Sequence, residues 1–317
     1  MRSGVRRAVL TVLAVLGLAN APAQADVVRI GYQKYGALIL LKAQGGLEKA
    51  LAPQHVSVQW IEFPGGPQLL EGLNVGSVDI GVTGETPPIF AQAAGADLRY
   101  IAYEPPAPHS EAILVQRDSP IRSVRELKGR KVALNKGSNV HYLLVRALAE
   151  AGLSYRDIQP VYLAPADARA AFERGSVAAW AIWDPYQAAA EQQLHARVLR
   201  DGASLVDNHQ FHLARGAFAD THSAVLSAVI EAVRQVDDAA RRDPDAFARR
   251  IAPGLGLSED IVRIAVRRQA FDALPLDTAT VAAQQRIADT FTTLRLVPRS
   301  LRVADAIWRA PRGASAR

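Results

Sequence analysis

The chain has 317 residues, of which 49% are hydrophobic and 21% are charged, and its formal net charge is +6. This composition excludes a disordered or collagen-like chain, and the length suits two domains that each bury a core. There is no cysteine, which excludes disulfides, thiolate metal sites and a cysteine nucleophile, and the single methionine is Met1.

The first 25 residues have the three parts of a secretory signal peptide. Three arginines lie within residues 1–7, residues 8–19 form an apolar run too short to span a membrane, and Ala23-Gln24-Ala25 matches an Ala-x-Ala cleavage site. We expect cleavage after Ala25 and a periplasmic location, with an uncleaved anchor as the alternative. Cleavage would lower the net charge to about +3, and since no basic tract carries aromatic residues, we do not expect a nucleic-acid partner.

Strands and helices then alternate, which favours mostly parallel α/β sheets. The hydrophobic pattern predicts strands at 27–32, 56–63, 78–82 and 98–103, separated by helices at 37–50, 67–75 and 86–94. The last of these helices is expected to begin with Thr86 as its N-cap and Pro87 at its first position.

The same alternation restarts after a crossing strand at 113–116. It predicts strands at 131–134, 158–163, 178–183 and 198–200, and helices at 138–151, 166–174 and 185–193. Residues 211–214 are predicted to form a return crossing, and the chain is predicted to be helical from about residue 219.

These elements predict an α/β protein of two similar lobes joined by two crossing segments, a hinged clamshell. The first lobe would comprise residues 26–112 and 208–317, and the second lobe residues 113–207. A short repeat relates the two halves, because Gly76-Ser77-Val78 and Gly175-Ser176-Val177 both follow a helix and precede a strand. Glu85 and Asp184 follow the two repeats at the same spacing. Ligands of open α/β sheets bind beyond the carboxyl ends of strands, so these turns predict a cleft between the lobes.

The strand-to-helix turns are typical of an anion site. Thr83-Gly84-Glu85 and Gly137-Ser138-Asn139 each precede a helix, whose unpaired N–H groups and dipole face outward, and Ser138 or Asn139 can cap. Gln33, after the first strand, can donate an amide hydrogen bond. Glu85 argues against a highly charged anion nearby, unless it bonds a donor on the ligand or holds the hinge.

Trp183 is a candidate for packing against an organic tail, and a core position is the equal alternative. Asp184 is more readily explained as a cap for the helix that follows Pro185. Glu85 and Asp184 could in principle act as a general acid and base. The sequence shows no paired histidines, nucleophile elbow or phosphate-binding loop, so we expect no catalytic residue, metal or cofactor.

Five stretches together resemble the periplasmic aliphatic-sulfonate-binding proteins of ABC importers, a group related to taurine-, nitrate- and thiamine-precursor-binding proteins. The resemblance extends over nearly all of the chain beyond residue 25, and the stretches that carry it are 30–49 (IGYQKYGALILLKAQGGLEK), 62–97 (beginning EFPGGPQLLEGLN), 127–148, 165–186 and 295–308. The resemblance implies a type II periplasmic-binding fold and a monomer that delivers a sulfonate to an inner-membrane permease and its ATPase. It also implies a ligand site at Gln33, Thr83, Gly84, Glu85, Gly137, Ser138, Asn139, Trp183 and Asp184. Glu85 stands where the family usually has Asp, and Tyr142 where it usually has a smaller polar residue.

A sulfonate suits these turns because it is a permanent anion with three acceptor oxygens. A mature chain without sulfur also suits a protein made to acquire sulfur. A receptor for taurine, nitrate or another small organic anion is the alternative, and Glu85 and Asp184 would suit an amino-sulfonate. An enzyme on the same fold is a further alternative, although the enzymes that resemble this group use a cysteine, which this chain lacks. A sensor without a transport role also remains open.

Overall fold

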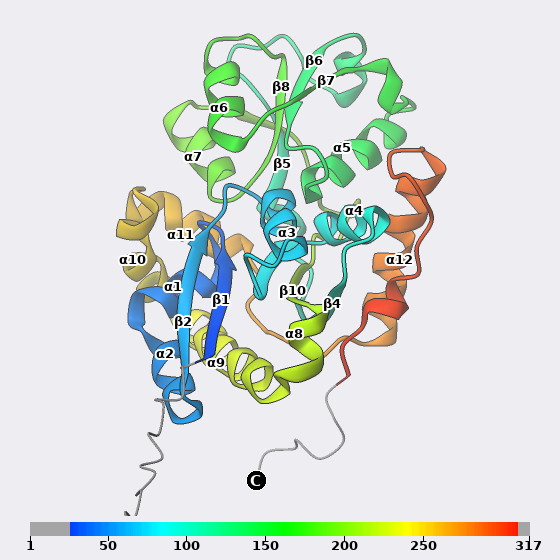
Figure 1. The fold of residues 1–317 in the computed structure, drawn as a ribbon. Coiled ribbons are helices and arrows are strands. Elements are labelled where there is room, and N and C mark those ends of the chain that lie inside the picture. The colour runs from blue at the N-terminus through cyan, green and yellow to red at the C-terminus, as the bar shows by residue number, and fades with distance from the viewer. Residues whose placement is uncertain (1–25, 310–317) are drawn as a thin grey trace, which may run out of the picture.

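The computed structural model describes residues 26–309, which form two five-stranded sheets, each flanked by helices (Figure 1). In the first sheet the strand order is β2-β1-β3-β10-β4. Its strands are β1 (Asp26–Tyr32), β2 (Val56–Glu62), β3 (Ile80–Gly84), β4 (Leu98–Glu104) and β10 (Gln210–Arg215). β1 is parallel to β2 and β3, whereas β10 lies antiparallel between β3 and β4.

The second sheet repeats this arrangement, in the order β7-β6-β8-β5-β9. Its strands are β5 (Glu111–Val115), β6 (Lys131–Leu134), β7 (Gln159–Tyr162), β8 (Ala179–Trp183) and β9 (Arg197–Asp201). β6 is parallel to β7 and β8, and β5 is antiparallel to β8 and β9. The prediction of two similar α/β lobes is therefore confirmed. β3 and β8 are buried along their whole length, as central strands covered on both faces must be.

The helices cover both faces of the sheets and fill the C-terminal part of the chain. They are α1 (Gly36–Gln44), α2 (Gly46–Leu51), α3 (Gly66–Asn74), α4 (Thr86–Ala94), α5 (Asn139–Glu150), α6 (Pro165–Glu173), α7 (Tyr186–Gln193), α8 (Gly216–Thr221), α9 (Ser223–Arg242), α10 (Pro244–Leu255), α11 (Glu259–Arg268) and α12 (Thr278–Thr293). Short 3₁₀ turns lie at Ala52–Gln54, Pro108–Ser110, Val124–Leu127, Tyr155–Asp157 and Val303–Ala306. In α9, Val225, Val229 and Val236 form the buried stripe of an amphipathic helix.

Several local predictions differ from the structure. The crossing strands predicted at 113–116 and 211–214 are β5 and β10, which lie within the two sheets. The helix predicted at 37–50 is split at Gly45, whose φ of 60° lies in the left-handed region, and its N–H bonds back to Lys42 to end α1. The residue before α4 is Glu85, not Thr86, so the predicted Thr86 cap is wrong. Glu85 already has a helical backbone, with φ −70° and ψ −29°, which makes Thr86 the first helical residue and leaves it unable to cap.

The lobes are packed together behind the cleft as well as linked by the chain. One apolar core contains residues of both lobes, such as Leu69 of α3 and Leu134 of β6. Phe291 of α12 contacts Phe90 of α4 in the first lobe and Tyr142 of α5 in the second, with ring centroids 5.0 and 6.0 Å away. α12 therefore runs along the side of both lobes (Figure 1).

The predicted signal peptide lies outside the described residues. Among residues 26–309, no helix combines the length and the hydropathy that crossing a membrane would require.

Candidate functional site

A cavity lies between the two lobes. Five of the predicted site residues line it: Gln33, Gly84, Asn139, Trp183 and Asp184. The other four, Thr83, Glu85, Gly137 and Ser138, lie behind the lining. Other polar residues also line the cavity, among them Tyr35, Glu104, Ser110, Asn208 and Gln210.

The lobes approach each other closely at two glycines of the first lobe, Gly84 and Gly65. A Cβ atom on Gly84, at the end of β3, would lie 2.8 Å from Cγ of Asn139, the first residue of α5. Nearby, a Cβ on Gly65 would lie 2.7 Å from Nδ2 of Asn135. An added Cβ atom would therefore crowd the first lobe against α5 and the turn before it at both positions.

The return strand β10 brings in residues that local patterns do not reveal. Its antiparallel register sets Gln210 opposite Gly84 on one side and Glu104 on the other. Gln210 Oε1 accepts a hydrogen bond from the Tyr35 hydroxyl at 2.7 Å, and Gln33 Nε2 donates to the Val82 carbonyl at 3.0 Å. Burial raises the pKa of Tyr35 far above its usual value, so the phenol stays neutral and able to donate.

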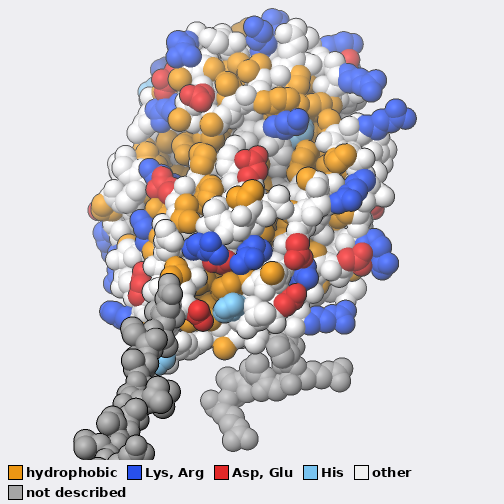
Figure 2. All heavy atoms as spheres, viewed as in Figure 1, with side chains coloured by type: hydrophobic (Ala, Val, Ile, Leu, Met, Phe, Trp, Pro, Cys, Tyr) orange, Lys and Arg blue, Asp and Glu red, His pale blue; other side chains and the backbone are white. Residues whose placement is uncertain are grey.

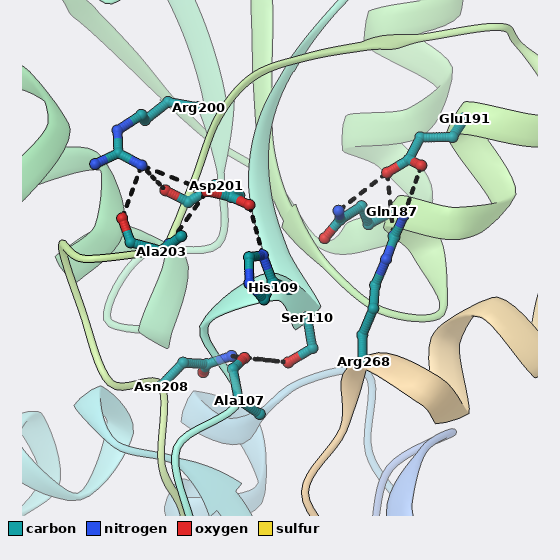
Figure 3. A network of polar contacts seen from close by, with 10 residues as sticks. All are labelled: Ala107, His109, Ser110, Gln187, Glu191, Arg200, Asp201, Ala203, Asn208 and Arg268. Carbon is teal, nitrogen blue, oxygen red and sulfur yellow. Dashed lines mark hydrogen bonds and ion pairs between the residues drawn. The ribbon is translucent and has the colours of Figure 1, made fainter. Parts of the chain in front are cut away.

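The N-terminus of α5 is oriented by a buried network. Asn139 Nδ2 donates to Glu111 Oε2 at 2.5 Å and to Asn208 Oδ1 at 2.9 Å. Asn208 Nδ2 in turn donates to the Ala107 carbonyl and to Ser110 Oγ, at 3.0 and 2.9 Å (Figure 3). This network comes from β5, α5 and both crossing segments, so the position of Asn139 depends on the hinge.

The α5 turn is also braced from within. Gly137 N donates to His141 Nδ1 at 3.2 Å, and Ser138 Oγ donates to the Asn135 carbonyl at 2.7 Å. Ser138 is thus the N-cap residue, but its side chain supports the turn and does not cap the helix. The first-turn N–H groups of Asn139 and Val140 have no intrahelical acceptor and can bind an anion. At α4, by contrast, Pro87 and Pro88 remove two such donors.

Asp184 and Trp183 end β8 at the opposite wall. Asp184 Oδ1 accepts from Ala188 N, in the first turn of α7, at 3.0 Å, although the residue that directly precedes the helix is Pro185. Burial raises the pKa of Asp184 to about 7, although Arg268, with Nη1 3.6 Å from Oδ1, opposes the shift. Trp183 lines the cavity and meets Tyr186 edge-on at 6.3 Å, and it also belongs to the apolar core.

Glu85 points away from the cavity, toward the hinge. Its Oε2 accepts from His209 N at 3.0 Å, and it borders a separate hollow that Arg146 and Asp207 also line. Burial, with a smaller contribution from Asp207, raises the pKa of Glu85 to about 8. Burial and the neighbouring charge of Glu85 raise the pKa of Glu111 well above its usual value.

The cavity lining contains no lysine or arginine, and its carboxyl groups are those of Glu104 and Asp184. On the outer face in Figure 2, basic side chains are scattered among acidic and neutral ones over both lobes. Within residues 26–309 there is no cluster of three or more His, Asp or Glu side chains that could hold a metal ion. Any anion bound in the cavity must therefore rely on N–H, amide and hydroxyl donors.

A second set of contacts joins the lobes at the mouth of the cavity. Arg268, at the end of α11, donates to both carboxylate oxygens of Glu191 in α7, at 3.1 and 2.7 Å (Figure 3). Ala188 and Ala189 of α7 pack against Ile261 and Ala265 of α11 beneath this ion pair. The residues that follow α11, Gln269 and Ala270, line the cavity.

The chain is similar to known binding proteins over nearly its whole length. Residues 53–247 match the model of the NMT1/THI5-like family. An aliphatic sulfonates-binding protein of Escherichia coli (strain K12) is 44% identical over 97% of both chains, and one of Bacillus subtilis (strain 168) is 34% identical over 63% of this chain and 60% of its own.

Solved structures agree with these matches. The alkanesulfonate-binding protein SsuA of Xanthomonas axonopodis pv. citri, bound to MOPS, has a TM-score of 0.87 and 43% identity, covering 91% of this chain and all of its own. The periplasmic aliphatic sulphonate binding protein SsuA of Escherichia coli has a TM-score of 0.82 and 44% identity, covering 93% and 96% of the two chains. The fold, the extent of the match and the level of identity together show that this chain belongs to the aliphatic-sulfonate-binding proteins of the NMT1/THI5-like family.

Proposed function

We propose that this protein captures aliphatic sulfonates in the cavity between its lobes and delivers them to an ABC importer in the inner membrane for sulfur acquisition. The observation that carries the proposal is the braced N-terminus of α5, which presents Asn139 and unpaired N–H groups to a cavity without cationic side chains. A sulfonate has one delocalised negative charge, which several converging dipoles can stabilise without an ion pair.

In this proposal the sulfonate oxygens accept from the backbone N–H groups of the first turn of α5, because both Nδ2 hydrogens of Asn139 are already donated to Glu111 and Asn208. Gln33, Tyr35 and the Gly84 backbone lie opposite. The tail points toward Trp183 and Asp184. Thr83, Glu85, Gly137 and Ser138 support the site from behind and do not touch the ligand. We propose that residues 26–112 and 208–317 form the first lobe and residues 113–207 the second, with the segments between β4 and β5 and between β9 and β10 joining them.

We further propose that the mature protein begins at Asp26, acts in the periplasm as a monomer, and is not an enzyme. The chain has no cysteine and therefore no thiol nucleophile. A desulfurization enzyme, DszB, shares the fold at 17% identity and a TM-score of 0.65, and that likeness concerns the fold alone.

The test is calorimetric titration of the mature protein after unfolding and refolding to remove bound ligand. The panel contains alkanesulfonates of graded length, an aromatic sulfonate, taurine, sulfate and nitrate. Tight binding of sulfonates without binding of sulfate or nitrate supports the proposal. Binding of nitrate alone, or turnover of any of these compounds, contradicts it. A ligand at 100 times its Kd adds about 2.7 kcal/mol to the free energy of unfolding, which gives a thermal check.

The side chain of Trp183 sets a second test. Trp183→Ala is expected to weaken binding of long-tailed and aromatic sulfonates by about tenfold, and short ones far less, because only the long tails reach the ring. Titration of the tail-length series measures this difference. An equal loss for every ligand would mean that Trp183 acts only through the core.

A receptor for an amino-sulfonate such as taurine is the second candidate. Glu104 and Asp184 favour it, since either carboxylate in the cavity could pair with an ammonium group. A taurine-binding periplasmic protein of Escherichia coli (strain K12) is 25% identical over 75% of this chain. Tighter binding of taurine than of ethanesulfonate in the same titration would select this candidate.

A further inference from the structure

Two carboxyl groups face the hinge from opposite lobes. Glu85 directly follows β3 of the first sheet, and Glu111 begins β5 of the second. Their exposed fractions are 1% and 0%. Glu85 Oε2 is bound by His209 N and Glu111 Oε2 by Asn139 Nδ2, whereas Oε1 of each has no hydrogen-bond partner among the described residues.

No cation compensates these carboxyl groups. Within residues 26–309, no lysine or arginine forms an ion pair with either of them. The polar and charged groups around the two come from β4, from the segment before β10, and from α5 and α12: Glu104, Asp207, Asn208, His209, Asn139, Tyr142, Arg146, Gln284 and Arg286. Arg146 donates to its own helix neighbour Tyr142, at 3.0 Å.

Two buried carboxylates without a counter-ion cannot both be ionised at low cost. A proton on one oxygen turns an acceptor into a donor and removes one of the two charges. The charge of Glu85 acts on Glu111, so the two titrate together. Because Glu111 also holds Asn139 in the cavity, the protonation of this pair is linked to the ligand site.

We propose that Glu85 and Glu111 keep at least one proton between them at neutral pH, and that this proton favours the closed arrangement of the lobes around a ligand. Glu111 is then a positioning residue, which acts on the ligand through Asn139. The inference rests on the proposed function, since ligand affinity is one of its two readouts.

The direction of the pH effect follows from the difference in carboxyl pKa between the closed and open arrangements of the lobes. In the structure the pKa of Glu85 is about 8, and we take this arrangement as the closed one. Opening of the lobes would expose the carboxyl groups to water and return their pKa toward 4.5. Closure therefore takes up a proton between these values, and sulfonate affinity falls as pH rises from 4.5 to 8, by up to about tenfold per pH unit. Above about 8 the affinity levels off.

The experiment compares the wild type with the isosteric double variant Glu85→Gln/Glu111→Gln. Calorimetry with a permanently anionic alkanesulfonate, at pH 5.5, 6.5 and 7.5 in buffers of different ionisation enthalpy and without sulfonate groups, counts the protons taken up. Asp184 lines the cavity and titrates near 7, so the measured quantity is the difference between the two proteins. On ligand binding, we expect the double variant to take up fewer protons than the wild type, with a difference of at most one. Asp237→Asn, which removes a buried carboxyl group in α9 with a raised pKa, is the control that keeps the wild-type uptake.

Small-angle X-ray scattering of the ligand-free protein gives a readout independent of any ligand. The wild type should have a larger radius of gyration at pH 8.5 than at pH 5.5, and the double variant should not. Equal proton uptake in wild type and double variant, or an unchanged radius in the wild type, overturns the inference. If no sulfonate binds at any pH, the proposed function fails, and scattering alone decides the proton-linked hinge.

Discussion

At the scale of single residues, Gly84 lets the lobes pack closely because it has no Cβ atom. Asn139, the neighbour that an added Cβ would strike, is held by Glu111 and Asn208 and cannot move aside. Gly84→Ala is expected to weaken sulfonate binding by about tenfold or more and to cost about 1–3 kcal/mol of unfolding free energy, as overpacking does. Titration and urea unfolding measure the two effects. Gly254→Ala in α10 is the matched control, because its Cβ would meet only Ile39, at 3.8 Å; equal losses in both variants would contradict the explanation.

At the scale of elements, the tip of α5 depends on a neutral histidine. His141 accepts from Gly137 N and is enclosed by Tyr155, Phe291 and Phe90, with ring centroids 5.0, 5.3 and 5.9 Å away. Burial, with a smaller contribution from Lys136, lowers the pKa of His141 from 6.5 to about 3.

Between pH 3 and 6.5, His141 is therefore neutral in the folded protein but protonated in the unfolded chain. His141 contributes stability that is fully present above pH 6.5 and is lost as pH falls toward 3, by up to about 1.4 kcal/mol per pH unit. His141→Phe should flatten this part of the pH profile, measured by urea unfolding at pH 7, 5.5 and 4.5. His55→Asn, at an exposed position, is the control and should keep the wild-type slope.

The sequence predicts single helices, strands and turns, but not the contacts between elements that are far apart in the chain. The strand-to-helix turns that carry Gly84 and Asn139 follow from local apolar runs, glycines and caps, and the structure brings both to the cavity. The direction of the Glu85 side chain does not follow from such patterns, because the segment before β10, which binds it, lies far away in sequence. Gln210 and Glu111 were missed for the same reason: β10 and β5 bring them to the site through antiparallel pairing between distant segments.

At the scale of the whole molecule, one ion pair joins the two lobes beside the cavity. It links Arg268 of α11 to Glu191 of α7, and we call it the clasp. Arg268 reaches across from the C-terminal helices to Glu191 and Asp184 of the second lobe. Its removal leaves two largely buried carboxyl groups without their cation whenever the lobes close, so the closed state loses population relative to the open one. If closure becomes less favourable by about 1.4 kcal/mol, the Kd of the ligand rises tenfold.

We therefore expect Arg268→Ala to raise the Kd for a sulfonate by about tenfold, mainly through faster dissociation, because the clasp forms after the ligand has entered. Stopped-flow dissociation and calorimetry measure the two quantities. Arg267→Ala is the matched control, since Arg267 lies in the same helix but pairs with Asp245 of α10, on its own side of the cleft. Equal effects of the two variants would assign the loss to α11 itself. A loss confined to Arg268→Ala would show that ligand affinity is set partly by a contact that never touches the ligand.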